Sequence, residues 1–196
     1  MSDPNRLPGE RDVRTTLDGD GSDCIVIACP PHPQFGGDRH DSRLRAVSDA
    51  LVEQDTDCLR IDYGSWDEGT GERTDALTAI DWASDRYDAV GLFGYSFGGA
   101  VALSAAIEAG SLGAVSALAP AAGSVAGFDP DCLDAIDGPA QVVYGERDDT
   151  ADWQSVVERA EQLDWVVESI PADHFFVGQQ SRVGDLAGGF LAEALG

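Results

Sequence analysis

The sequence predicts an α/β fold in which one mainly parallel sheet carries helices on both faces. Short apolar runs of strand type alternate with longer helical stretches from residue 24 to the end of the sequence. This alternation is typical of parallel strands that are joined by helices. The chain has 196 residues, of which 43% are hydrophobic. That is enough for one domain with a substantial core and too little for a second large domain.

The chain divides into a lead-in and one main domain. Residues 1–23 form a polar lead-in with one short strand near residues 13–17, and residues 24–196 are expected to form the main domain. Within that domain only segment 120–138 is long enough for an insertion between elements. Because this segment is short and irregular, we expect no lid domain over the sheet.

The expected elements of the main domain alternate in a regular order. Each strand is a short apolar run, and each helix has apolar or small residues at helical spacing. The expected order is strand 24–29, helix 43–53, strand 57–63, helix 74–86, strand 89–93, helix 100–109, strands 114–119 and 141–144, helix 153–163, strand 165–170 and helix 185–195.

The charge composition is strongly acidic. Asp and Glu number 36 against 12 basic residues, all of them Arg, which gives a formal net charge of −24. Such a surface repels phosphate backbones and anionic lipids, so we expect neither a nucleic-acid nor a membrane partner. An acidic surface without lysine predicts a halophilic protein, because molar salt screens the repulsion between carboxylates.

The sequence also predicts a soluble, cytoplasmic protein. No apolar stretch approaches the roughly 20 residues that a membrane-spanning helix requires. Residues 1–23 are polar and acidic, so we expect no signal peptide. The sequence leaves the oligomeric state open.

The cysteines indicate neither a metal site nor a redox centre. None of the four cysteines forms a C-x-x-C pair or has a histidine at metal-ligand spacing. Cys24, Cys29 and Cys58 lie in or beside strand-like runs, so we expect them to be buried free thiols. The sequence therefore predicts no metal and no organic cofactor.

The sharpest local motif is the G-x-S-x-G sequence at residues 94–98, between strand 89–93 and the following helix. In this strand–turn–helix context the motif predicts a nucleophile elbow, which holds the Ser96 hydroxyl at the carboxyl edge of the sheet. The glycine spacing does not fit a dinucleotide-binding loop, and the absence of Lys excludes a P-loop.

A nucleophilic serine needs a histidine base, and the base needs a carboxylate that orients it. In folds with this elbow the chain order is Ser, then acid, then His, and His174 is the single histidine after Ser96. Asp148 directly follows strand 141–144 and is the preferred acid. Asp149 is the nearest alternative, and Glu146 is the third.

An acyl-transfer site also requires donors for the oxyanion. One is expected to be the backbone N–H of Phe97, the residue after the nucleophile. The second should come from the loop after strand 24–29, where prolines have no N–H. This leaves Gln34 as the preferred donor, with His32 or Phe35 as alternatives. We expect Tyr95 and Phe35 to line the substrate pocket.

The order of these motifs resembles the α/β-hydrolase superfamily, and within it the small lid-less branch of predicted alpha/beta hydrolases near the dienelactone hydrolases. The resemblance covers about residues 24–195. It implies a single-domain α/β-hydrolase fold without a lid. Unlike true dienelactone hydrolases, which use a cysteine, this chain has Ser96 as the expected nucleophile. Three segments carry the resemblance: H-P-x-x-G-G at residues 32–37, D-x-G-x-G-E-x-x-D in residues 67–75, and D-H-F-F-x-G at residues 173–178.

The sequence therefore predicts a serine hydrolase that cleaves a small ester, thioester or related acyl substrate through an acyl-enzyme. Glu72, in the second of the three segments, is expected to be a structural acceptor and not a catalytic acid. The alternative is a catalytically silent domain of the same fold that binds a small ligand or a protein partner.

Overall fold

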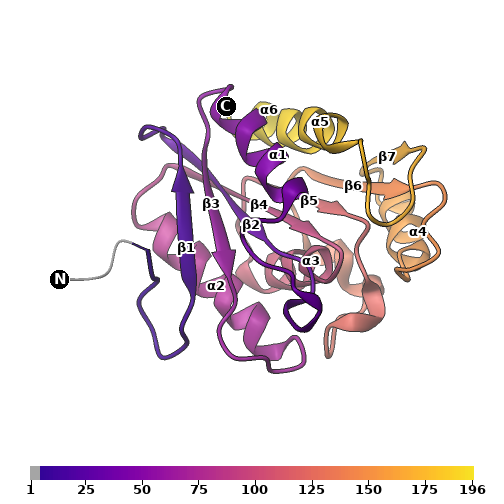
Figure 1. The fold of residues 1–196 in the computed structure, drawn as a ribbon, viewed down its shortest axis with the longest axis horizontal. Helices are drawn as coiled ribbons and strands as arrows, with labels where there is room; N and C mark the ends of the chain where they lie inside the picture. Colours follow the sequence, from indigo (N-terminus) through magenta and orange to yellow (C-terminus); the bar gives the residue numbers. More distant parts are fainter. Residues whose placement is uncertain (1–4) are drawn as a thin grey trace.

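The computed structural model describes residues 5–196, and its centre is a seven-stranded sheet of order β1-β3-β2-β4-β5-β6-β7 (Figure 1). Strands β2 to β7 are parallel, and β1 pairs antiparallel with β3 at one edge. The expected mainly parallel α/β architecture is therefore confirmed. The strands are β1 (Arg14–Asp18), β2 (Cys24–Cys29), β3 (Asp57–Asp62), β4 (Ala89–Tyr95), β5 (Ala114–Leu118), β6 (Ala140–Gly145) and β7 (Val166–Ile170).

Helices cover both faces of the sheet (Figure 1). One buried cluster joins the sheet to α2, α3 and α4, and a second joins the other face to α1 and the C-terminal helix. The lead-in contributes strand β1, and its residues 1–4 lie outside the described residues. The helices are α1 (Ser42–Val52), α2 (Thr70–Ser84), α3 (Phe97–Ala109), α4 (Gln154–Gln162), α5 (Gln180–Val183) and α6 (Gly189–Leu195), with a π-helical turn, Gly184–Gly188, between the last two.

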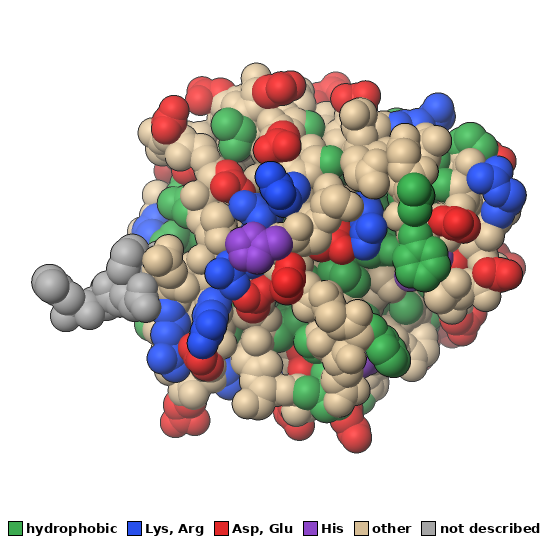
Figure 2. Space-filling view, viewed as in Figure 1, with side chains coloured by type: hydrophobic (Ala, Val, Ile, Leu, Met, Phe, Trp, Pro, Cys, Tyr) green, Lys and Arg blue, Asp and Glu red, His purple; other side chains and the backbone are tan. Residues whose placement is uncertain are grey.

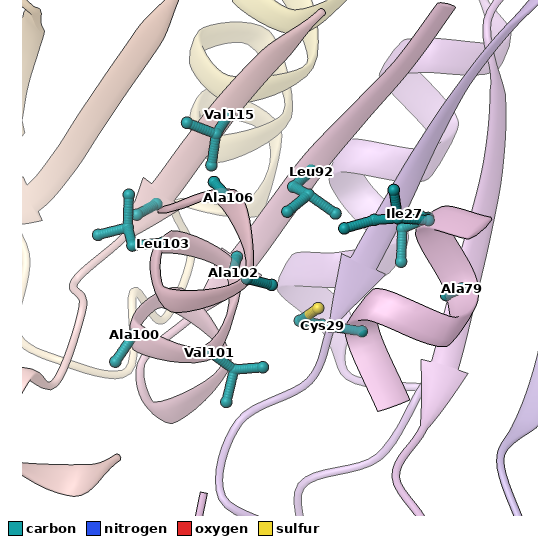
Figure 3. Packing of buried hydrophobic residues seen from close by; sticks show 14 of the residues in the cluster. Ile27, Cys29, Ala79, Leu92, Ala100, Val101, Ala102, Leu103, Ala106 and Val115 are labelled. Atoms are coloured by element: carbon teal, nitrogen blue, oxygen red, sulfur yellow. The ribbon is translucent and has the colours of Figure 1, made fainter. Parts of the chain in front are cut away.

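Helix α3 is the most deeply buried helix and is the one that carries the turn at Ser96. All its residues from Phe97 to Ala106 are buried. Figure 3 shows the small side chains of Ala102 and Ala106 beside Leu92 of β4 and Val115 of β5. Small residues let the helix lie close to the sheet, where a methyl-sized change in volume is already felt. The position of the turn before α3 is therefore set by core packing.

Helix α2 and the closing helical stretch begin at least four residues earlier than the sequence indicates. Helix α2 begins at Thr70, because the Glu72 carboxylate accepts hydrogen bonds from the backbone N–H groups of Asp67 (3.0 Å) and Gly69 (2.8 Å) and so caps its first turn. This confirms Glu72 as a structural acceptor. The closing helical stretch begins at Gln180, five residues before the expected start, and continues through the π-helical turn.

The cysteines are free thiols, as expected, but they differ in exposure. Cys29 and Cys58 are buried, Cys24 is half-buried and Cys132 is exposed. Burial raises the pKa of both Cys29 and Cys58 to about 12, so these two thiols remain protonated and unreactive at neutral pH. Between residues 5 and 196 no group of three or more Cys, His, Asp or Glu side chains is placed to hold a metal ion.

The surface carries its negative charge in a dispersed form. Figure 2 shows acidic side chains around the whole outline of the visible face, with arginines among them. Several arginines pair with acidic groups, for example Arg11 with Asp75 (2.6 Å) and Arg60 with Asp18 (2.6 Å). Most of the 36 carboxylates lack such a cation, since only 12 arginines exist. Within the described residues no helix is both long and apolar enough to cross a membrane.

This charge distribution predicts that salt stabilises the fold. The free energy of unfolding, measured by urea denaturation, should rise as KCl increases from about 0.1 M to about 2 M, because the screening length falls from about 10 Å to under 3 Å. Repulsion between surface carboxylates weakens accordingly. A free energy of unfolding that stays flat across the series would contradict the halophilic interpretation.

Candidate active site

Ser96 lies on a strained turn between β4 and α3. Its backbone has φ 57° and ψ −118°, a conformation that costs a non-glycine residue about 1–3 kcal/mol. The turn is possible because two glycines leave room for it. A Cβ on Gly94 would collide with the Gly98 carbonyl group, and a Cβ on Gly98 would collide with the carbonyl oxygens of Cys29 and Pro30. The expected nucleophile-elbow geometry is therefore present.

His174 and Asp148 complete a chain of hydrogen bonds that begins at Ser96. The Ser96 Oγ lies 2.9 Å from Nε2 of His174, and Nδ1 of His174 lies 2.8 Å from Oδ2 of Asp148. The Asp148 side chain is completely buried. Its other oxygen, Oδ1, accepts from the backbone N–H groups of Thr150 (2.9 Å) and Ala151 (3.1 Å). Both carboxylate oxygens are thus occupied, which fixes the orientation of the carboxylate.

The structure distinguishes Asp148 from Asp149 and Glu146, the two alternatives for the carboxylate that orients His174. Asp149 is exposed. Glu146 accepts a hydrogen bond from the Ser169 hydroxyl on β7 (3.1 Å). In the described part of the chain, His174 has its carboxylate contact with Asp148 alone.

Tyr95 and Arg43 hold the loop that carries His174. The buried Tyr95 hydroxyl donates to the backbone carbonyl of His174 (2.8 Å), and burial raises the pKa of Tyr95. The Arg43 guanidinium lies 4.5 Å from the centre of the Tyr95 ring, pairs with Asp41 (2.5 Å) and donates to the carbonyl of Phe175 (3.3 Å). Tyr95 therefore lines the pocket as expected, while its hydroxyl is engaged with the histidine loop.

Sequence reasoning missed Arg43 and Asp41. Both lie at the start of α1, and both line the cavity above Ser96. Asp41 is also the N-cap of α1. Burial raises the pKa of this carboxyl group, an effect that the nearby Arg43 partly offsets. The one available signal was an Asp two residues before an Arg at a helix start, a pattern too common to indicate a site.

The loop after β2 does not present Gln34 as expected. The Gln34 N–H donates to Nδ1 of His32 (3.3 Å), and Gln34 does not line the cavity. The Phe35 N–H donates to the His32 carbonyl (3.0 Å). Among the described residues, no hydrogen bond uses the N–H of His32 or that of Phe97. Phe97, the expected donor, and His32, one of the two alternatives, both line the cavity together with Ser96.

His32 has a supporting role in this loop. Burial lowers the pKa of its imidazole and so favours the neutral ring. Nδ1 of this ring accepts the hydrogen bond from the Gln34 N–H. Its ring packs against those of Phe35 (4.6 Å between centroids), Trp66 (4.5 Å) and Phe97 (4.9 Å). The ring contacts hold the loop against the residue that follows Ser96.

Ser96 opens onto a cavity of about 550 Å³. Its volume is in the range of small-molecule sites. Phe35 lies at the mouth as expected and is 86% exposed. The lining residues are Pro31, His32, Phe35, Gly36, Gly37, Asp41, Arg43, Tyr95, Ser96, Phe97, Ala121, Ser124, Thr150, Ala151, His174 and Phe175.

The sheet order and the strained serine turn before α3 define an α/β-hydrolase. The chain belongs to the dienelactone hydrolase family, whose model matches residues 53–187. Membership makes it an α/β-hydrolase enzyme of the carboxylic-ester hydrolase type.

Individual relatives are distant in sequence and close in fold. An uncharacterized protein of Rickettsia prowazekii is 24% identical over 170 residues, which cover 78% of this chain and 71% of that protein. An alpha-beta serine hydrolase homologue from Coxiella burnetii superposes with a TM-score of 0.80 at 23% identity, over 96% of this chain and 97% of that one. A lid-less serine hydrolase from Xanthomonas campestris superposes with a TM-score of 0.77 at 24% identity, over 97% of this chain and 92% of that one. These superpositions support the lid-less fold.

Proposed function

We propose that the protein hydrolyses small esters or thioesters with Ser96 as nucleophile, His174 as general base and Asp148 as the orienting acid. The observation that carries this proposal is the unbroken hydrogen-bond chain from Ser96 through His174 to buried Asp148. The Ser96 end of this chain faces an open cavity. No cofactor is required for this chemistry.

The reaction has two stages. His174 Nε2 takes the proton from Ser96 Oγ as the oxygen bonds to the carbonyl carbon of the substrate. The N–H groups of Phe97 and His32 stabilise the negative charge on the carbonyl oxygen. The bond to the leaving group then breaks, and His174 protonates the departing alcohol or thiol. Water, activated by His174, releases the acid from Ser96 in the second stage.

Asp148 acts through His174. Because its Oδ2 contacts Nδ1, the histidine proton stays on Nδ1 while Nε2 is free to accept from Ser96. The negative charge of Asp148 also stabilises the imidazolium that forms during each stage. Burial of the carboxylate strengthens this electrostatic effect.

A silent binding domain is the weaker candidate. It would be favoured by a buried serine or a displaced carboxylate, whereas Ser96 is half-buried and lines the cavity. The cavity, in a fold that superposes on a lid-less serine hydrolase, fits a compact acyl substrate.

Labelling with a fluorophosphonate probe tests the nucleophile. Wild-type protein in about 2–3 M KCl, where carboxylate repulsion is screened, should be labelled, and Ser96→Ala should not be, because the probe reacts only with an activated serine. Ser124→Ala is the matched control, since Ser124 lines the same cavity but its hydroxyl donates to the Ala121 carbonyl (2.6 Å). This variant should retain the label. A folded wild type that takes no label would favour the silent binding domain.

A further inference from the structure

Two exposed aromatic rings lie at the mouth of the cavity. Among residues 5–196, six large hydrophobic side chains are exposed, and the two aromatic ones, Phe35 (86% exposed) and Phe175 (56%), both line the cavity above Ser96. Exposed aromatic surface is unfavourable in water. An exposed apolar surface at a site marks a contact with an apolar partner.

The two rings contact different parts of the site. Phe35 packs on His32, which in turn packs on Phe97. It therefore belongs to the side of the free N–H groups. Phe175 meets His174 edge-to-face, with 5.7 Å between the ring centroids. It therefore belongs to the side of the general base.

The backbone of Phe175 is fixed, although its ring is exposed. Its N–H donates to the Asp173 carboxylate (3.0 Å), and its carbonyl accepts from Arg43. The Tyr95 hydroxyl holds the neighbouring carbonyl of His174. The ring is thus presented at the cavity mouth by an anchored backbone, so it can contribute binding energy at a low cost in ordering.

The chemistry of the proposed function assigns substrate groups to these sides. The carbonyl oxygen must lie at the N–H groups of Phe97 and His32. The leaving oxygen must lie within hydrogen-bond reach of His174 Nε2, because that atom protonates it. The alcohol portion of an ester therefore leaves along the side that Phe175 covers.

We infer that Phe175 is the residue that selects the leaving group, and that the substrate is an uncharged ester of an apolar, preferably aromatic, alcohol. The inference rests on the proposed function and deepens it. An aromatic ring favours offset or edge-to-face contact with a second ring. The net charge of −24 disfavours an anionic alcohol portion at the same mouth.

A series of acetate esters that differ only in the alcohol tests this inference. All of them form the same acetyl-enzyme, so differences in kcat/KM report on the acylation step and on the alcohol alone. We would compare ethyl, benzyl and 2-phenylethyl acetate by pH-stat titration, for wild type, Phe175→Ala and Phe35→Ala. Intrinsic differences between the alcohols cancel when the benzyl-to-ethyl ratio of a variant is divided by that of the wild type.

Phe175→Ala should lower the benzyl-to-ethyl ratio of kcat/KM about fivefold, as expected for the loss of one ring–ring contact. Phe35→Ala is the matched control, because it removes the other exposed ring that lines the cavity. This variant should leave the ratio within about twofold. An unchanged ratio in Phe175→Ala, or an equal fall in Phe35→Ala, would overturn the inference while leaving the proposed function intact. A folded wild type that hydrolyses none of the esters would overturn the proposed function, and the inference with it.

Discussion

Asp148→Asn should lower kcat by about 10³- to 10⁴-fold without unfolding the protein, an effect of the size that loss of a triad carboxylate produces. An Asn amide that donates to Nδ1 of His174 would hold the imidazole in the tautomer that carries its proton on Nε2. Nε2 could then no longer accept the proton of Ser96. The removal of the negative charge also leaves the imidazolium without its partner. The Asn oxygen can still accept from the N–H groups of Thr150 and Ala151, so the local turn should persist.

Asp149→Asn is the control for this experiment. It makes the same chemical change one residue away, on an exposed side chain. Its kcat should stay within about twofold of the wild type, as for most surface substitutions. Steady-state hydrolysis of an ester that the wild type accepts, with circular dichroism to monitor folding, decides between the two. A large loss in Asp149→Asn and a small one in Asp148→Asn would show that the acid is misassigned.

The sequence was sufficient to find the order of the site residues. Ser96, Asp148 and His174 each follow a short apolar run, and parallel strands place the ends of such runs at one edge of the sheet. The sequence was also sufficient for the order of strands and helices along the chain, because apolar runs and helical spacing are local patterns.

The choice between neighbouring residues depends on the turn after β6. Asp148 and Asp149 are identical in type, and only the backbone of the turn decides that one is buried against His174 while the other is exposed. The oxyanion donor is a similar case. The absence of an N–H on proline reduced the number of candidate donors in the loop after β2. The contact between Gln34 and His32, however, depends on the conformation of a short 3₁₀ turn at Pro33–Phe35.

Contacts between distant segments were beyond sequence reasoning. Arg43 meets Tyr95 and Phe175, which follow it by more than 50 and more than 130 positions along the chain. Nothing in the local sequence around Arg43 indicates this meeting, because it follows from the packing of α1 on one face of the sheet. The cap by Glu72 differs in kind, because it is local: the sequence predicted Glu72 as a structural acceptor, although it did not place the start of α2 at Thr70.

Gly98→Ala should damage both the fold and the chemistry. The added methyl group would collide with the carbonyl oxygens of Cys29 and Pro30, which are backbone atoms at the end of β2 and at the start of the loop that carries His32. A buried collision of this kind costs about 1–3 kcal/mol of unfolding free energy. The chain can relieve the collision by moving that loop away from α3, which displaces the donor that we propose at His32. We therefore expect kcat to fall about 100-fold or more, the effect of losing one such donor.

The matched control is Gly123→Ala, because a Cβ at that position meets no atom within 4 Å and its φ lies outside the left-handed region. Urea denaturation and single-turnover acylation of both variants separate the two effects. If Gly98→Ala loses stability but acylates at the wild-type rate, the close approach of α3 to the loop supports the fold alone. If it also acylates about 100-fold more slowly, the glycine is required because it holds the loop of His32 against the nucleophile, and the tight packing of α3 is then part of the catalytic geometry.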